Sequence, residues 1–238
     1  MHPSHRNLFC SLLILCLVSP CLPQSTQPDT SQPLASSPTH TPLIELGPNL
    51  FQMGHIQLNK TNRTISFPAV VNLTESPVEY LLVASFGKIH ESILRTETAP
   101  YQIHLAMLLL GAKGAGIDAF PEDLSKPVPG DSLAISLQWV DQGRTNTHAA
   151  ERVVMDISRQ KPMTPRRWAY NGSHLFEGTF LAQQEGSIIS LYSDPVALIN
   201  QSGPDRDNDE NWLPNPKSLP AEETPLTVIL RLTASSAK

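Results

Sequence analysis

Residues 88–94 carry a carboxylate and an imidazole at a spacing that could support metal binding or acid–base chemistry. Successive residues of a strand point to opposite faces, so a strand here places Glu91 on the same face as Ile89 and Ile93. A carboxylate in an apolar layer is costly unless it is paired, hydrogen-bonded or protonated. His104, further along the chain, is a candidate partner for it.

Two interpretations of these side chains stay open. In the first, His90, Glu91 and His104 form a transition-metal site or an acid–base site, because imidazole and carboxylate suit both roles. In the second, Glu91 ties together the corner between the strand and a following helix, and His104 is a hydrogen-bonded core histidine. His90 lies on the opposite strand face from Glu91, which favours the second interpretation.

A second candidate is the acidic stretch at residues 205–212, where Asp205, Asp207 and Asp209 alternate as in the start of a calcium loop. The sixth position of such a loop is normally glycine and the twelfth a bidentate glutamate, but this chain has Glu210 and Pro216 there. The pattern therefore favours an acidic surface turn, with weak calcium binding as the alternative.

Other kinds of chemistry find no support in the sequence. It contains no G-x-S-x-G elbow, phosphate loop, dinucleotide fingerprint or H-E-x-x-H motif. Its three cysteines, Cys10, Cys16 and Cys21, all lie near the start of the chain, which excludes a disulfide framework or a thiolate metal site in the domain that follows. The net charge of −5 and the absence of a basic cluster argue against nucleic-acid binding.

The elements that must position these side chains begin after an export segment. Residues 8–18 are uncharged and mostly apolar, which is the right length for a signal peptide and too short for a spanning helix. We therefore expect a signal peptide over residues 1–21 and no transmembrane helix in the mature protein. The stretch before Cys21 loosely matches a lipobox, so lipidation of Cys21 is the alternative to free release, and it would be the only attachment to a membrane.

Two further regions follow the signal peptide. Residues 22–42 are rich in Pro, Ser and Thr and predict a semi-rigid extended linker. Residues 43–238 predict one globular domain of α+β class, with a mostly antiparallel or mixed β-sheet, one long buried helix at about residues 99–111 and short helical turns. The helix is expected to be buried because its residues 103–110 are apolar nearly all round. Strands are expected at residues 51–58, 64–71, 78–83, 88–94, 132–140, 168–170, 176–182, 187–192 and 226–232, with a short helix or strand at 151–156.

Several segments of the domain resemble the YdjY-domain family of bacterial envelope proteins. The resemblance rests on residues 79–83, Gly87-Lys88 with 90–92, Pro100 with 103–111, and the turns at 171–173, 185–189 and 194–200. It runs from about residue 56 to 232 and implies a bacterial protein of the periplasm or cell envelope. The family has no established activity, substrate or cofactor, so the resemblance implies only that His90, Glu91 and His104, which stand at motif positions, are the residues to test.

These observations favour a non-catalytic binding or structural module of the cell envelope. Its expected partner is another envelope protein or a cell-surface component, and no cofactor is assigned. Two alternatives remain: a metal-dependent or acid–base enzyme that uses Glu91 with His104 or His90, and a calcium-stabilised binding domain. The sequence does not decide whether the protein is an enzyme.

Overall fold

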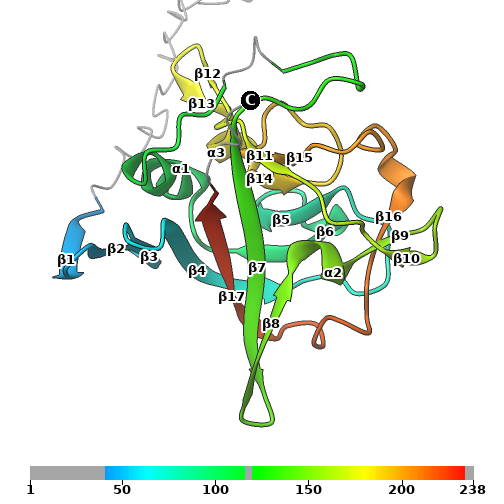
Figure 1. Cartoon of the computed structure of the whole chain (residues 1–238), viewed down its shortest axis with the longest axis horizontal. Coiled ribbons are helices and arrows are strands. Elements are labelled where there is room, and N and C mark those ends of the chain that lie inside the picture. Colours follow the sequence, from blue (N-terminus) through cyan, green and yellow to red (C-terminus); the bar gives the residue numbers. More distant parts are fainter. Residues whose placement is uncertain (1–40, 116–119, 234–238) are drawn as a thin grey trace, which may run out of the picture. The chain divides into compact units, whose positions relative to one another are not determined.

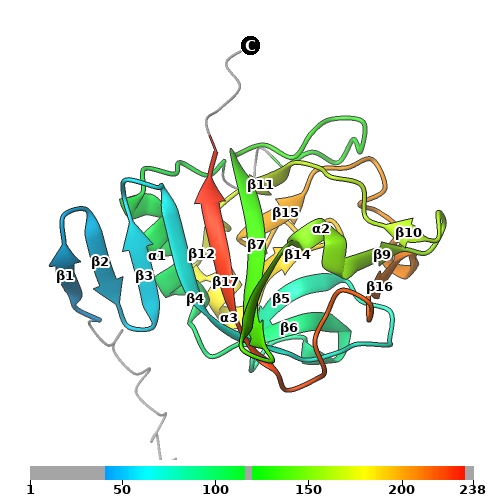
Figure 2. The same cartoon turned by 60° about the horizontal axis from the view of Figure 1, so that its bottom comes forward.

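The fold is a closed β-barrel with a sheet extension. It is described by a computed structural model that covers residues 41–115 and 120–233. Eight strands close the wall, and Figures 1 and 2 show them arranged around a common axis. In order around the barrel they are β4 (Thr64–Val71), β17 (Pro225–Leu232), β7 (Asp131–Asp141), β11 (Trp168–Tyr170), β15 (Ile199–Gln201), β14 (Ser187–Ser190), β5 (Tyr80–Ala84) and β6 (Ser92–Thr96).

The barrel closes where β6 pairs with the second half of β4, with Val70 opposite Arg95. The first half of β4 pairs with β3 instead, from Thr64 to Ser66. The change of partner falls at Pro68, which has no backbone N–H to donate and whose carbonyl accepts a 2.6 Å hydrogen bond from the Thr96 hydroxyl. All neighbouring strands of the wall are antiparallel except the pairs β14–β15 and β5–β6.

The remaining elements lie outside the wall. A meander of β1 (Leu43–Gly47), β2 (Leu50–Met53) and β3 (Ile56–Asn59) extends the sheet from β4, and β8 (Arg144–Ala149) forms a long ribbon with β7. A three-stranded sheet and a hairpin complete the β-structure: β10 (Lys161–Pro162), β9 (Val154–Asp156) and β16 (Trp212–Pro214), and β12 (Leu175–Phe176) with β13 (Thr179–Phe180). The helices are α1 (Pro100–Leu109), α2 (Ala150–Val153) and α3 (Leu181–Glu185), with 3-10 turns η1 (Ile89–Glu91) and η3 (Asp209–Asn211).

The wall supplies its own core. Strands β4, β7 and β17 alternate between buried apolar and exposed or half-buried residues along most of their length, so one face points inward and the other faces solvent. Strands β5, β11, β14 and β15 are buried at every position, which places them in the covered half of the barrel. Buried apolar residues of these strands and of α1 belong to one hydrophobic cluster.

The predicted α+β class with one long buried helix at about residues 99–111 was wrong. The described part of the chain is mostly β, with 13% of those residues helical and one helix longer than seven residues. That helix, α1, buries Pro100, Ile103, Ala106 and Met107 and leaves other apolar side chains exposed. The apolar run predicted helix formation correctly, but a closed barrel is filled by its own strands, so the helix packs outside the wall. No helix in residues 41–115 or 120–233 is long and apolar enough to cross a membrane.

Candidate functional site

The structure places His90 and Glu91 at the surface. They lie in η1 and not on a strand, because β6 begins only at Ser92. The His90 side chain is 78% exposed and that of Glu91 23%, with 3.7 Å between Nε2 and Oε2. Glu91 therefore does not lie in an apolar layer, and the expectation that it shares a strand face with Ile89 and Ile93 was wrong.

His104 lies in α1, beyond the other end of β6. Its Nδ1 is 2.8 Å from the hydroxyl oxygen of Tyr170, and its ring packs 4.8 Å from that of Phe180. Burial lowers the pKa of His104, which favours the neutral imidazole. No hydrogen bond or ion pair joins His104 to Glu91 in the described part of the chain, where the ring of His104 is bonded to Tyr170 and the carboxylate of Glu91 lies beside His90. The surroundings of His104 agree with the interpretation as a hydrogen-bonded core histidine.

In the acidic stretch at residues 205–212, arginine side chains pair with Asp205. Both carboxylate oxygens of Asp205 accept hydrogen bonds from Arg166, and Arg159 lies 3.6 Å away. Asp207 and Asp209 are exposed, and Asn208 caps the short turn that follows. Among residues 41–115 and 120–233, no group of three or more His, Cys, Asp or Glu side chains is placed to hold a metal ion. Cys21, the candidate for lipidation, lies outside the described residues.

Sequence reasoning missed the role of Arg206 within this stretch. The side chain is 1% exposed. Its guanidinium donates to the backbone carbonyls of Leu124, Lys126 and Gly203 at 2.7–3.1 Å, which fastens the loop before β7. Burial lowers the pKa of Arg206, but the carbonyls compensate the buried charge. No pattern in the sequence distinguishes this arginine from one on an acidic surface turn.

The residues of the family motif instead converge around Tyr80. Its hydroxyl donates to Asp194 Oδ2 at 3.0 Å and accepts from Lys88 Nζ at 2.9 Å. Burial, followed by the charge of Asp194, raises the pKa of Tyr80, so the phenol stays protonated and can donate to the carboxylate. Tyr80 is 1% exposed, so this cluster is an internal brace and not an open reaction centre.

Two glycines bring the brace together. A Cβ on Gly186 would lie 2.8 Å from the Cα of Gly87, and a Cβ on Gly87 would lie 3.0 Å from the carbonyl oxygen of Glu185. Gly186 also has a φ of 74° as it ends α3, a conformation that glycine adopts without strain. This close contact holds the turn after β5 against the turn before β14. It thereby positions Lys88, the residue after Gly87, beside the hydroxyl of Tyr80.

Buried amides complete this framework at Asn171 and Asn200. The Asn200 amide donates to Asn171 Oδ1 at 2.9 Å and to the Asp194 carbonyl at 2.8 Å, while its own oxygen accepts from the Asp194 N–H. Asn171 donates in turn to the carbonyl of Ala197. Buried polar groups that are fully bonded to one another fix a structure, and the motif residues of this region serve that role.

Comparison with known proteins identifies the family. A family model described as the YdjY domain matches residues 56–231, which is most of the chain and spans the whole barrel wall except Leu232, the last residue of β17. No curated protein matches the chain, and no solved structure does. The motif segments that suggested the resemblance are the ones that build the internal brace and the Asn171–Asn200 network. The chain belongs to the YdjY domain family.

Proposed function

We propose that this protein is an exported, non-catalytic binding module of the bacterial cell envelope. The proposal is supported by the use of the motif side chains Tyr80, Lys88 and Asp194, which bond to one another inside the fold and leave little for chemistry on a substrate. The binding role rests on one observation, an apolar surface on the outside of α1.

This surface, named here the α1 face, consists of the exposed Tyr101 and Leu108 of the helix, the half-buried Leu105 between them, and the exposed Leu175 and Phe176 of the β12–β13 hairpin. The three helical residues are spaced i, i+4 and i+7 and therefore lie along one side of α1. Tyr101 is 48% exposed, Leu175 70% and Phe176 60%. Single exposed apolar residues are ordinary, but a cluster on neighbouring elements is typical of a surface that another molecule covers.

The helix and the hairpin are in contact, so the α1 face is continuous. The ring of Tyr101 meets that of Phe180 edge-on at a centroid distance of 5.9 Å. Phe180 is paired across the hairpin with Leu175. Figure 1 shows the hairpin near α1, at the opposite end of the molecule from the turn of the β7–β8 ribbon. The partner that such a face suits is a protein that presents an apolar surface of its own.

Export is supported by the uncharged run at residues 8–18 and by the envelope location that the family resemblance implies. We expect cleavage near residue 21, with a lipid on Cys21 as the alternative. Mass spectrometry of the protein recovered from the cell envelope distinguishes the two, because acylation adds a large mass to the N-terminal peptide. An intact N-terminus beginning at Met1 on cytoplasmic protein would contradict export.

Photo-crosslinking in cells tests the binding role. A photoreactive amino acid at Phe176 should trap one discrete partner, whereas the same group at Arg144, exposed at the start of β8, should not. Leu108→Lys should abolish the product trapped at position 176 with little change in the melting temperature, because Leu108 is already 44% exposed and a cation is favourable in the last turn of a helix. Equal trapping at positions 144 and 176, or no product at either, would contradict the proposal.

A further inference from the structure

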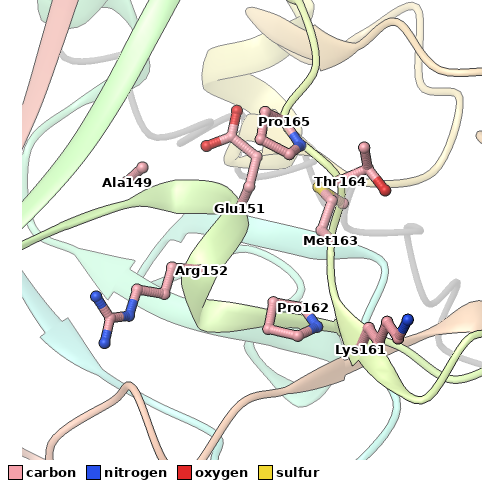
Figure 3. Close-up of a pocket in the computed structure, with 8 residues that line it drawn as sticks. All are labelled: Ala149, Glu151, Arg152, Lys161, Pro162, Met163, Thr164 and Pro165. Carbon is pink, nitrogen blue, oxygen red and sulfur yellow. The ribbon is translucent and has the colours of Figure 1, made fainter.

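A second surface lies on the other side of the molecule, between α2 and the chain that follows β10. It is an open hollow of about 510 Å³, a volume within the usual range for small-molecule sites. Figure 3 shows its walls, with α2 on one side and residues 161–165 on the other. The apolar lining comes from Ala149, Pro162, Met163 and Pro165. We name this feature the α2 hollow.

Regular pairing fixes the walls of the α2 hollow. Strand β10 pairs with β9, with Lys161 opposite Asp156, and the N–H of Met163 continues the ladder with a 2.8 Å bond to the carbonyl of Val154. Pro162 and Pro165 restrict the backbone dihedral angles of this segment. The shape of the hollow is therefore built into the backbone and does not depend on the rotamers of long side chains.

Charges are separated along the rim. Figure 3 shows Arg152 and Lys161 on the lower border, and Glu151 on the upper border. Glu151 is already engaged, since its Oε1 accepts a 2.8 Å hydrogen bond from the indole N–H of the buried Trp168. The side chains of Arg152 and Lys161 are exposed and form no hydrogen bond or ion pair with the described residues 41–115 and 120–233. The lower border of the apolar hollow thus carries two cations, one on each side, without a counter-ion from the described chain.

We propose that the α2 hollow binds a single-chain amphiphile that has an aliphatic body and a carboxylate head. The aliphatic body would cover the exposed Ala149, Pro162 and Pro165 over the buried Met163, and the carboxylate would pair at the lower border with Arg152 or Lys161. A small inorganic anion would leave the apolar lining in water, and a neutral alkyl chain would leave both cations unmatched. This proposal does not rest on the α1 face, because the two surfaces share no residue.

Titration with octanoate and decanoate, at concentrations where both are monomeric, tests the inference. Amide NMR shifts of the isotope-labelled full chain should move at residues 149–153 and 161–164 and not on α1. Decanoate should bind roughly tenfold more tightly than octanoate, because each buried methylene adds a similar increment. Decyltrimethylammonium, which has the same aliphatic body and a cationic head, should bind more weakly than decanoate.

Two variants and a matched control separate the charge from the apolar lining. Arg152→Ala with Lys161→Ala should weaken decanoate binding about three- to tenfold, the range expected for two solvent-exposed ion pairs. Arg144→Ala with Lys217→Ala removes the same charge at exposed positions outside the hollow and should change nothing. Ala149→Phe should fill part of the hollow and reduce the gain from octanoate to decanoate.

Three results would overturn the proposal. The first is unchanged decanoate affinity in the Arg152/Lys161 double variant, and the second is equal affinity for the cationic amphiphile. The third is the absence of shifts near the hollow with monomeric decanoate when the protein does bind anionic vesicles, which would assign the cations to a membrane surface. Circular dichroism of each variant confirms that lost binding does not reflect unfolding.

Discussion

At the scale of single residues, His104 links the stability of the fold to pH. Burial lowers its pKa, so near neutral pH its imidazole is uncharged and shares a hydrogen bond with the hydroxyl of Tyr170. Between the folded-state pKa and the usual value near 6.5, the unfolded chain binds more protons at this position than the folded chain does. Stability at this site is therefore full above about pH 6.5, falls as pH decreases towards the folded-state pKa, and levels off below it.

The variant His104→Gln isolates this contribution, because glutamine can still hydrogen-bond Tyr170 but does not titrate. We expect the unfolding free energy of the natural protein to fall relative to that of the variant as pH decreases from 7.5 to 5. Urea denaturation at several pH values measures the difference, and carboxylates elsewhere affect both proteins alike. Parallel pH profiles would show that folding does not lower the pKa of His104.

At the scale of elements, the contact between Gly87 and Gly186 tests whether the family motif is structural. Gly186→Ala places an alanine at a backbone position with positive φ, and its Cβ would lie 2.8 Å from the Cα of Gly87. Gly143 in the β7–β8 turn has nearly the same φ, 73°, but nothing within 4 Å of its Cβ position. Gly143→Ala should cost about 1–2 kcal/mol from backbone strain alone, and Gly186→Ala at least about 1 kcal/mol more. Equal shifts in the urea midpoint would show that the turns are free to separate.

The same contact explains why part of the sequence prediction failed. Strands β4, β7 and β17 were predicted correctly, because each has one face in solvent and alternates accordingly. Residues 88–91 were also predicted as part of a strand, because Ile89 alternates with Ile93, but the turn after β5 meets the end of α3 through Gly87 and forms η1 instead. Tertiary packing determines the conformation of this segment, and a local sequence pattern carries no information about tertiary packing. The outward side of α1 was missed similarly, because an apolar helix does not reveal which of its sides the fold covers.

At the scale of the whole molecule, closure of the barrel depends on pairings between distant parts of the chain. Strand β17, near the end of the sequence, lies between β4 and β7 and pairs with both along nearly its full length. The sequence predicted these strands but not their order, since nothing in an alternating pattern specifies which edges meet. The prediction of the candidate site failed for the same reason. His90 and His104 are near in sequence, but β6 lies between them in the chain. Tyr80 and Asp194 are distant in sequence, yet their side chains are hydrogen-bonded.

This arrangement predicts that β17 is indispensable and β1 is not. Removing residues 225–232 exposes the inner edges of β4 and β7 and deletes four buried apolar side chains, each contributing about 1.5–3 kcal/mol. The sum is comparable to the total stability of a typical domain, so this variant should show no cooperative thermal transition. Deleting residues 43–47 removes β1, which pairs only with β2 outside the wall and buries none of its side chains, so the transition should persist. A cooperative transition without β17 would mean that β4 and β7 can pair directly, and the barrel would then be a smaller closed sheet stabilised by, but not dependent on, its last strand.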